Sequence, residues 1–374
     1  MRILFVTGTS TGGAARSTDE LARRLQGRGH EVAGLFGWQP RPRRWQMDGP
    51  RRGQMDGARV GRGLSRRVDR ATHRVRASMP PRPQAVPGRT YPVWRDRVPE
   101  RSLPMTCRQW SPDVVVVSAV GSSAWRTMRP HLAGSHTPCV LYLRTQGAVH
   151  RLRDATLPDL VVANAWSFLD GARALGAEPV MIPSVVEADA CVVAGTRRRV
   201  LFVNPVRRHG LSTVLDVARQ RPEIPFTVHE SAPLHRRDRS TLRAAISAIP
   251  NVELRRGVAD PRDLYRDARL LLAPYEVSNR PRVVLEAHHN GLPVVARDLS
   301  ALRECVGPGG ILVPPTAPPA AWAAAVGELW DRPERYRSYA TAALRHSQRD
   351  EVDPATIVDR FEAELAGLVA HARR

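Results

Sequence analysis

The stretch LLLAPYEVSNRPRVVLEAHHNGLPVVAR, residues 270–297, decides the fold class. It begins and ends with short apolar runs that have the length and composition of buried strands. Between them, Pro281 can open a helix because its missing N–H needs no partner there, and Gly291 can close it. A strand, a helix and a second strand in succession predict a parallel sheet that is covered by helices.

The same alternation runs through both halves of the chain. The apolar runs of the first half are residues 2–7, 28–36, 113–120, 138–144, 158–164 and 179–183. Those of the second half are residues 197–205, 225–231, 251–257, 270–274, 292–297 and 310–315. We therefore expect an α/β protein with two doubly wound, Rossmann-like domains, residues 1–190 and 191–350, that face a central cleft. Residues 351–374 are expected to form a helix that packs back toward the first domain.

The basic residues are unevenly distributed. The chain has 374 residues, a formal net charge of +21 and no lysine, so any anion site must use arginine, histidine or backbone N–H groups. Residues 41–110 contain 18 arginines and five acidic residues, and they include the tandem octads RRWQMDGP and RRGQMDGA (43–58). We expect a solvated, partly disordered insertion there. It could contact an anionic acceptor, a membrane surface or nucleic acid, or have no specific ligand.

The composition also indicates the cellular compartment in which the protein is expected. No apolar run approaches the roughly 20 residues that cross a bilayer. The four cysteines, Cys107, Cys139, Cys191 and Cys305, lack the spacing of a zinc site or a disulfide framework. We expect a cytoplasmic protein that can associate peripherally with a membrane through its basic segment.

Glu286 falls inside the helix predicted between Pro281 and Gly291. The apolar residues around it occupy most of the helix circumference, so its carboxylate should be buried. A buried glutamate is costly unless hydrogen bonds or an opposite charge compensate it. The partner could be a neighbouring arginine, in a purely structural role, or a ligand hydroxyl.

Two strand-to-helix turns carry groups suited to phosphate. Gly12 and Gly13 follow the first strand and lead into a helix N-terminus, where free N–H groups favour an anion, although such glycines can also serve only a tight turn. Arg207, Arg208 and His209 occupy the equivalent turn of the second half. Their guanidinium groups suit a diphosphate, and a solvated basic turn is the alternative.

These segments resemble the GT-B glycosyltransferases of the family 4 type, which are retaining enzymes with nucleotide-sugar donors. The likeness rests on MRILFVTGTSTGGAARS, RGHEV, VLFVNPVRRHGL, NVELRRGVADPRDLYRDARLLLAP, RPRVVLEAHHNGLPVVA and LRECVGPGGILV. It implies that Glu286 is the second acid of the paired-glutamate motif and hydrogen-bonds the donor ribose. The first acid falls on Ser278, and Glu276 is the nearby carboxylate that could replace it.

The resemblance also indicates which residues would bind the donor diphosphate. The Arg and Lys of the family's diphosphate clamp fall on Asn204 and His209, which leaves Arg207 and Arg208 as charge donors. Arg144 stands where the family often has a histidine, and its role is either donor binding or structural.

By the same resemblance, the backbone N–H groups of residues 278–280, Ser278, Asn279 and Arg280, would face the sugar. The turn Gly257-Val258-Ala259 would lie beside the nucleobase. The implied reaction is a front-face displacement, and we expect it to need no metal or other cofactor because no Asp-rich motif is present.

The predicted function is therefore a hexosyltransferase-like, retaining glycosyltransferase that acts on a small-molecule or glycoconjugate acceptor, in secondary-metabolite or cell-envelope biosynthesis. A GT-B nucleotide-sugar 2-epimerase, which needs no acceptor, is the first alternative. A basic nucleic-acid-binding protein is the second, although no aromatic-rich RNA motif or zinc finger is found, so no specific nucleic-acid partner is expected.

Overall fold

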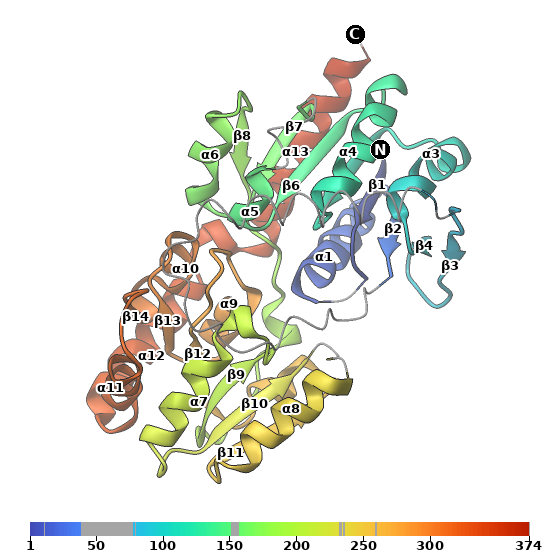
Figure 1. Ribbon diagram of the computed structural model, residues 1–374. Coiled ribbons are helices and arrows are strands. Elements are labelled where there is room, and N and C mark those ends of the chain that lie inside the picture. Colours follow the sequence, from blue (N-terminus) through green and yellow to red (C-terminus); the bar gives the residue numbers. More distant parts are fainter. Residues whose placement is uncertain are drawn as a thin grey trace.

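The computed structural model describes residues 1–10, 12–38, 78, 80–150, 157–231, 234, 236–258 and 260–373, which form two α/β domains (Figure 1). The first domain has an eight-stranded sheet with the order β3-β4-β2-β1-β5-β6-β7-β8, in which only β3 and β4 pair antiparallel. Its strands are β1 (Arg2–Thr7), β2 (Glu31–Gly37), β3 (Gln84–Ala85), β4 (Val93–Asp96), β5 (Val114–Ser118), β6 (Cys139–Leu143), β7 (Leu160–Ala163) and β8 (Pro179–Met181).

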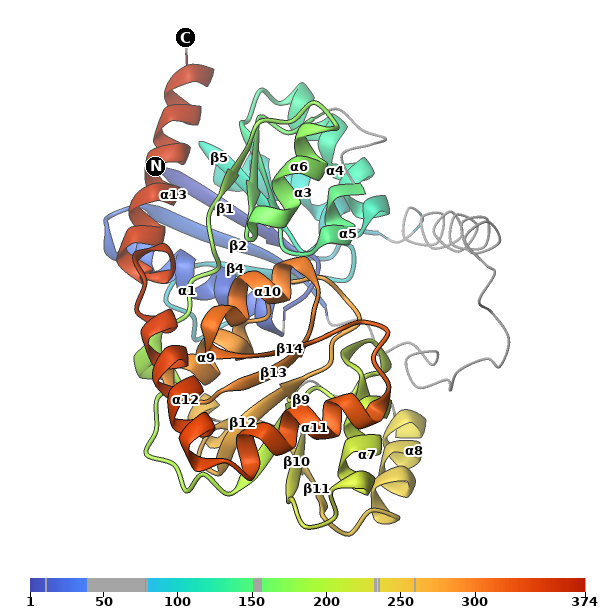
Figure 2. The same cartoon turned by 90° about the vertical axis from the view of Figure 1, so that its left-hand side faces the viewer.

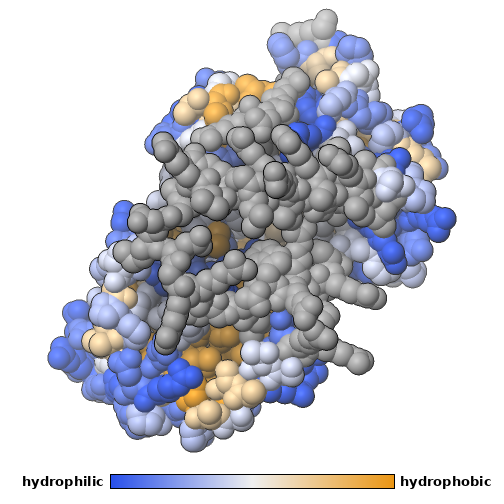
Figure 3. Space-filling view, in the orientation of Figure 1, coloured by the Kyte–Doolittle hydropathy of each residue, from blue (hydrophilic) through white to orange (hydrophobic). Residues whose placement is uncertain are grey.

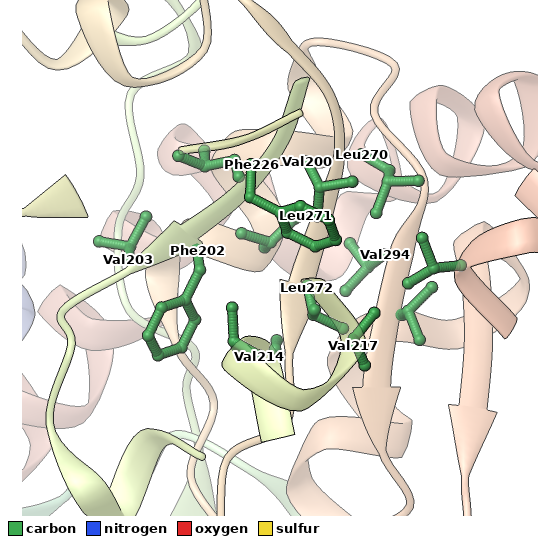
Figure 4. Packing of buried hydrophobic residues seen from close by; sticks show 14 of the residues in the cluster. Val200, Phe202, Val203, Val214, Val217, Phe226, Leu270, Leu271, Leu272 and Val294 are labelled. Atoms are coloured by element: carbon green, nitrogen blue, oxygen red, sulfur yellow. The ribbon is translucent and has the colours of Figure 1, made fainter. Parts of the chain in front are cut away.

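The second domain has a parallel sheet of six strands with the order β11-β10-β9-β12-β13-β14. Its strands are β9 (Arg199–Val203), β10 (Phe226–Glu230), β11 (Val252–Arg256), β12 (Ala268–Ala273), β13 (Val294–Arg297) and β14 (Gly310–Val313). Their apolar side chains are buried on both faces, and the core between β9, β12 and the first helix of this domain includes Phe202, Leu272 and Val214 (Figure 4). The predicted fold of two doubly wound parallel sheets is confirmed.

Helices cover both sheets. Those of the first domain are α1 (Gly13–Gly27), α3 (Pro99–Trp110), α4 (Ser122–Gly134), α5 (Gln146–Val149) and α6 (Leu169–Arg173). Those of the second are α7 (Leu211–Gln220), α8 (Arg236–Ser247), α9 (Arg282–His289), α10 (Ser300–Val306), α11 (Pro319–Trp330) and α12 (Pro333–Ser347). Helix α9 follows Pro281 and ends just before Gly291, whose φ is +61°. Among the described residues, no helix has both the length and the apolar character to span a bilayer.

The last helix, α13 (Pro354–Ala372), returns to the first domain (Figure 2). Its apolar face, which includes Ile357, Phe361 and Leu365, is buried in the core that also contains Ile3 and Phe5 of β1. The chain therefore crosses between the domains twice, once before β9 and once before α13. On the face seen in Figure 3, hydrophilic residues make up much of the described surface.

The predicted insertion is shorter than expected. Strand β4 pairs with β2, and Leu103 of α3 is fully buried in the first domain, so residues 93–110 belong to the domain itself. Asp96 fixes this segment by accepting hydrogen bonds from the Val98 N–H and the Ser102 hydroxyl. The tandem octads, residues 43–58, lie outside the described residues.

Each sheet has one point at which the strand order reverses. In the first sheet it lies between β1 and β5, and in the second between β9 and β12. The loops that follow β6 and β12 meet in an isolated antiparallel bridge between Thr145 and Asn279, so the carboxyl ends of the two sheets face each other. Because ligands of doubly wound sheets bind at such reversal points, the junction of the domains is where a site is expected.

Candidate functional site at the domain junction

The loops after β9 and β12 pack together into one surface. Gly210 has a φ of +79°, and a Cβ at this position would lie 2.2 Å from the Pro274 carbonyl oxygen. Only glycine tolerates both the conformation and the close approach. The Glu276 N–H donates to the Arg208 carbonyl oxygen over 2.9 Å. The two loops that border the reversal point are thus held at a fixed spacing.

The basic turn, η5 (Arg207–His209), carries two kinds of side chain. Arg207 and Arg208 are exposed to solvent. His209 stacks on Tyr275 with 4.5 Å between ring centroids, and its Nδ1–H donates to the Asn204 carbonyl oxygen over 3.1 Å. Burial, together with the neighbouring Arg208, lowers the pKa of His209 to about 4. The turn therefore offers two arginines as charges, whereas His209 is neutral near pH 7 and does not supply the charge of the family's lysine.

Glu286 is 2% exposed and already has partners within the chain. One oxygen accepts from Arg282 Nε over 2.9 Å and lies 3.3 Å from Arg16 Nη1, and the other accepts from the Tyr265 hydroxyl over 2.5 Å. Burial acts to raise the pKa of this carboxyl, but the two arginines outweigh it and the pKa is lowered. Arg282, Arg16 and Tyr265 engage the carboxylate in this conformation, so a ribose hydroxyl would have to displace or share one of these contacts. The role of Glu286 in binding the ribose stays a prediction.

The same arginine joins the two domains. Arg282 of α9 donates to both oxygens of Glu20 on α1, over 2.6 and 3.0 Å, and Arg16 Nε lies 3.2 Å from Glu20. We call the residues Arg16, Glu20, Arg282 and Glu286 the junction cluster. Glu20 and Glu286 are almost fully buried, at 3% and 2% exposure. Sequence analysis missed Arg282, although its four-residue spacing from Glu286 was a usable signal, and nothing in the sequence connected Glu20 to either.

The glycine turn after β1 lies next to this cluster. Gly12 precedes α1 with a φ of +86°, a conformation that favours glycine. A Cβ on Gly13 would be 3.3 Å from the Cδ atom of Arg282. The N-terminus of α1 thus faces α9 at the junction, and its role in phosphate binding stays a prediction.

Arg144 is a buried cation at the end of β6. Its side chain donates to the hydroxyls of Ser184 and Thr18, over 2.6 and 3.2 Å, and lies 4.1 Å from the ring centroid of Tyr142. Among the described residues it pairs with no carboxylate, and its Nε has no hydrogen-bond partner. Burial lowers the pKa of Arg144. An arginine that is 9% exposed with no acidic partner is a candidate for binding an anion.

The loop expected to face a sugar is joined to the first domain instead. Besides the Thr145–Asn279 bridge, the Gln146 N–H donates to the Ser278 carbonyl oxygen over 3.2 Å. Arg280 is paired with Glu351, with 2.5 Å between Nη2 and Oε1. In this conformation residues 278–280 hold the two domains together.

A further carboxylate of the second domain supports this closed arrangement. Glu304 accepts from the N–H groups of Trp166 and Ser167 over 2.8 and 2.7 Å, at the start of the 3₁₀ turn η3 (Trp166–Phe168). Such a contact satisfies backbone donors that have no partner within the turn. No sequence pattern pointed to Glu304 or Glu351, because both act across domains.

The remaining predicted residues lie on the second domain. The Ser278 hydroxyl lies 3.2 Å from the Ser300 hydroxyl and accepts from the Ala301 N–H at the start of α10, so it serves its own domain. Glu276 is exposed and remains a carboxylate that could face a substrate. Gly257, with a φ of +72°, and Val258 follow β11, an edge strand separated from β12 by β10 and β9, and Ala259 lies outside the described residues.

Comparison with known proteins adds to this geometry. Residues 197–332 match the family described as Glycosyl transferases group 1. A D-inositol 3-phosphate glycosyltransferase of Thermobispora bispora is 37% identical over 89 residues, a segment that spans 23% of this chain and 21% of that relative.

The fold comparison covers nearly the whole chain. Sucrose-phosphate synthase of Thermosynechococcus elongatus superposes with a TM-score of 0.76 and 14% identity over 99% of this chain and 100% of that one. Anabaena HepE, in complex with UDP-glucose, superposes with a TM-score of 0.71 and 16% identity over 98% and 100%. The chain thus has the GT-B fold of these glycosyltransferases, and its second domain matches the Glycosyl transferases group 1 family.

Proposed function

We propose that the protein is a retaining glycosyltransferase that moves a hexose from a nucleotide-sugar donor to an acceptor hydroxyl. One observation carries the proposal: the segment that matches Glycosyl transferases group 1, residues 197–332, contains the reversal point between β9 and β12. A nucleotide would bind outside the carboxyl ends of these two strands. The loops there carry the exposed Arg207, Arg208 and Glu276.

The donor diphosphate would meet positive groups from both domains. Arg207 and Arg208 lie in the turn after β9, while Arg144 and the N-terminus of α1 at Gly12 and Gly13 lie on the opposite side of the junction. Guanidinium groups and free helix N–H groups both stabilise phosphate oxygens. This distribution supports a site that is completed only when both domains contribute.

Glu286 would bind the ribose by exchanging partners. Both of its oxygens are engaged by Arg282, Arg16 and Tyr265 in this conformation. A ribose hydroxyl would displace one arginine, and that arginine would then be available to the diphosphate. Donor binding is therefore expected to rearrange the junction cluster and to release residues 278–280 from Thr145 and Gln146.

The proposed reaction needs no protein nucleophile. The acceptor oxygen bonds to the anomeric carbon on the face from which the nucleoside diphosphate leaves. The electron pair of the broken C–O bond goes to the diphosphate, and a diphosphate oxygen takes the acceptor proton. The protein holds both substrates together, and Arg207 and Arg208 stabilise the charge that grows on the leaving group. Glu276 would orient the transferred sugar, and no metal is expected to take part.

The relatives suggest the first substrates to test. Anabaena HepE forms a complex with UDP-glucose, and the Thermobispora relative is named for an inositol phosphate acceptor. UDP-sugars and phosphorylated polyols are therefore the first choices, within secondary-metabolite or cell-envelope biosynthesis. Peripheral binding to a membrane through the basic segment that precedes β4 would bring the protein to a lipid-linked acceptor.

A donor screen followed by turnover tests the proposal. Thermal shifts with UDP, GDP, ADP and dTDP should identify the base, since a ligand at 100 times its Kd adds about 2.7 kcal/mol of stability. With the matching nucleotide-sugar, the free diphosphate should form only when an acceptor is present, and the product should keep the anomeric configuration of the donor. Conversion of the donor to its 2-epimer without an acceptor would support the epimerase alternative and reject the transferase.

A further inference from the structure

A basic hollow lies on the second domain, outside the junction. It is a depression of about 710 Å³ that is open to solvent. Its lining includes Arg337, Ser338, Thr341, Arg345, His346 and Arg349, and we call these six residues the α12 pocket. Figure 2 shows α12, which carries most of them, at the edge of the second domain.

The pocket is formed by one helix face and one tight turn. Arg337, Thr341 and Arg345 follow one another at four-residue spacing, so they lie on the same face of α12. The opposite wall includes Pro308 of the turn η7 (Gly307–Gly309). A Cβ on Gly307 would be 2.4 Å from the His346 ring, so the turn packs directly against the pocket histidine.

The lining is positively charged and largely uncompensated. No acidic residue lines the pocket, and Arg337 and Arg345 form no ion pair with any described residue. On the same helix, by contrast, Arg332 and Arg335 both pair with Glu328, over 3.1 and 2.6 Å. Arg337 and Arg345 thus lack the carboxylate partner that Arg335 and Arg332, the N-cap residue of α12, share.

Arg349 and His346 form the deeper part of the lining. Arg349 is 23% exposed and lies 3.8 Å from Glu351, a carboxylate that Arg280 already engages at 2.5 Å. Its Nη1 also donates to the His346 carbonyl oxygen. Burial and Arg280 outweigh the effect of Glu351 and lower the pKa of Arg349 to about 10. The His346 Nε2 is buried and has no hydrogen-bond partner among the described residues.

Helix geometry accounts for only part of this arrangement. Cations near the C-terminus of a helix are favoured by its dipole, which explains Arg345 and His346 in the last turn of α12. It does not explain Arg337, which lies in the first half of the helix, or Arg349, which follows the helix and is half-buried.

We propose that the α12 pocket is a second binding site, which takes a phosphate-bearing ligand. Three guanidinium groups match phosphate oxygens in charge and geometry. The hydroxyls of Ser338 and Thr341 can bind further oxygens of the same ligand. The phosphate can belong to a soluble ester or to a lipid headgroup, and the exposed Leu344 beside Arg345 is compatible with the second source. This proposal does not depend on the proposed transferase function.

The test compares two double variants with the same change in charge. Arg337→Gln with Arg345→Gln removes two pocket cations, and Arg332→Gln with Arg335→Gln removes two cations of the same helix outside the pocket. Glycerol 3-phosphate binding is measured by calorimetry at constant ionic strength. Vesicles of phosphatidylcholine with phosphatidylglycerol are tested by co-sedimentation. Far-UV circular dichroism and the Tm of each variant serve as the check that it is folded.

The pocket variant should lose affinity by about tenfold or more, because a charge-assisted hydrogen bond is worth roughly a tenfold change in affinity. The control variant should stay within about twofold of the parent, since only two exposed ion pairs of small value are lost. Loss of glycerol 3-phosphate binding identifies a soluble ester as the ligand type, and loss of vesicle binding alone identifies a headgroup. Equal losses in both double variants, or no binding of either probe by the parent, would overturn the proposal.

Discussion

Replacing Arg282 by methionine is the sharpest test of the junction cluster. Methionine keeps the apolar stem of the side chain but removes the donors that reach Glu20 and Glu286. Two carboxylates at 3% and 2% exposure would then share Arg16, whose side chain is 31% exposed, as their one cation among the described residues, and Glu286 would keep the hydrogen bond from Tyr265. Breaking a buried ion pair costs about 3–5 kcal/mol, because one charge is left without compensation.

Thermal unfolding at neutral pH measures this loss. A domain of this size changes its Tm by about 2–4 °C for each kcal/mol, so the Arg282→Met variant should melt roughly 10 °C below the parent. The pKa of Glu286 is lowered in the folded parent, so its ion pairs contribute stability above the unfolded pKa of about 4.3 and lose it as the pH falls through the folded value. The difference between parent and variant should therefore persist down to about pH 4.3 and shrink only below that pH.

A double variant separates the charge effect from a packing effect. Glu20→Gln together with Arg282→Met leaves Arg16 and Glu286 as a balanced pair at 3.3 Å. We expect the double variant to be more stable than Arg282→Met alone, which is the signature of coupled charges. A Tm within about 2 °C of the parent for the single variant, or strictly additive losses in the double variant, would refute the reasoning.

Three further predictions concern the second domain. Alanine at Arg207 or Arg208 should lower kcat by roughly a hundredfold while the fold is retained, and parent-like turnover in both variants would show that the turn is only a solvated loop. Gly210→Ala should destabilise the protein by about 1–3 kcal/mol or more in denaturant unfolding, because its Cβ would contact the Pro274 carbonyl oxygen at a φ of +79°. The pKa of the buried His288 is lowered to about 3 by burial and by His346, so stability should fall as the pH drops below about 6.5, where the unfolded histidine takes up a proton. A His288→Leu variant should show a shallower fall over that range, and an identical pH profile would contradict the assignment.

The strand and helix pattern was predictable because strands that are buried on both faces need nearly continuous apolar sequences. Strands such as β5 and β12 are nearly continuous apolar runs, and α9 is bounded by Pro281 and Gly291. Residues 93–110 were misjudged because their arginines and low hydrophobicity resemble those of the preceding segment. Burial there depends on pairing with β2, which is distant in sequence.

The candidate site was only partly predictable, for a related reason. The turns that carry Gly12 and Arg207 follow strands and could be located from periodicity alone. The partner of Glu286 could not be chosen from the sequence, because Arg282 and a ligand hydroxyl can both donate a hydrogen bond to a buried carboxylate. The choice depends on Glu20, which α1 brings from the other domain.

The distribution of charge at the junction connects the domain contact with the proposed donor site. Arg16, Arg144 and Arg282 bring three positive charges to this region, whereas Glu20 and Glu286 bring two negative ones. Arg282 pairs with Glu286 on its own helix and with Glu20 of the first domain. Arg16 pairs with Glu20 on its own helix and with Glu286 of the second domain, whereas Arg144 pairs with no described carboxylate. A donor diphosphate would add negative charge beside these arginines, and its ribose would compete for Glu286. The domain contact and the donor would thus use the same groups, because the arginines that pair with Glu20 and Glu286 across the junction would become available to the diphosphate once Glu286 binds the ribose.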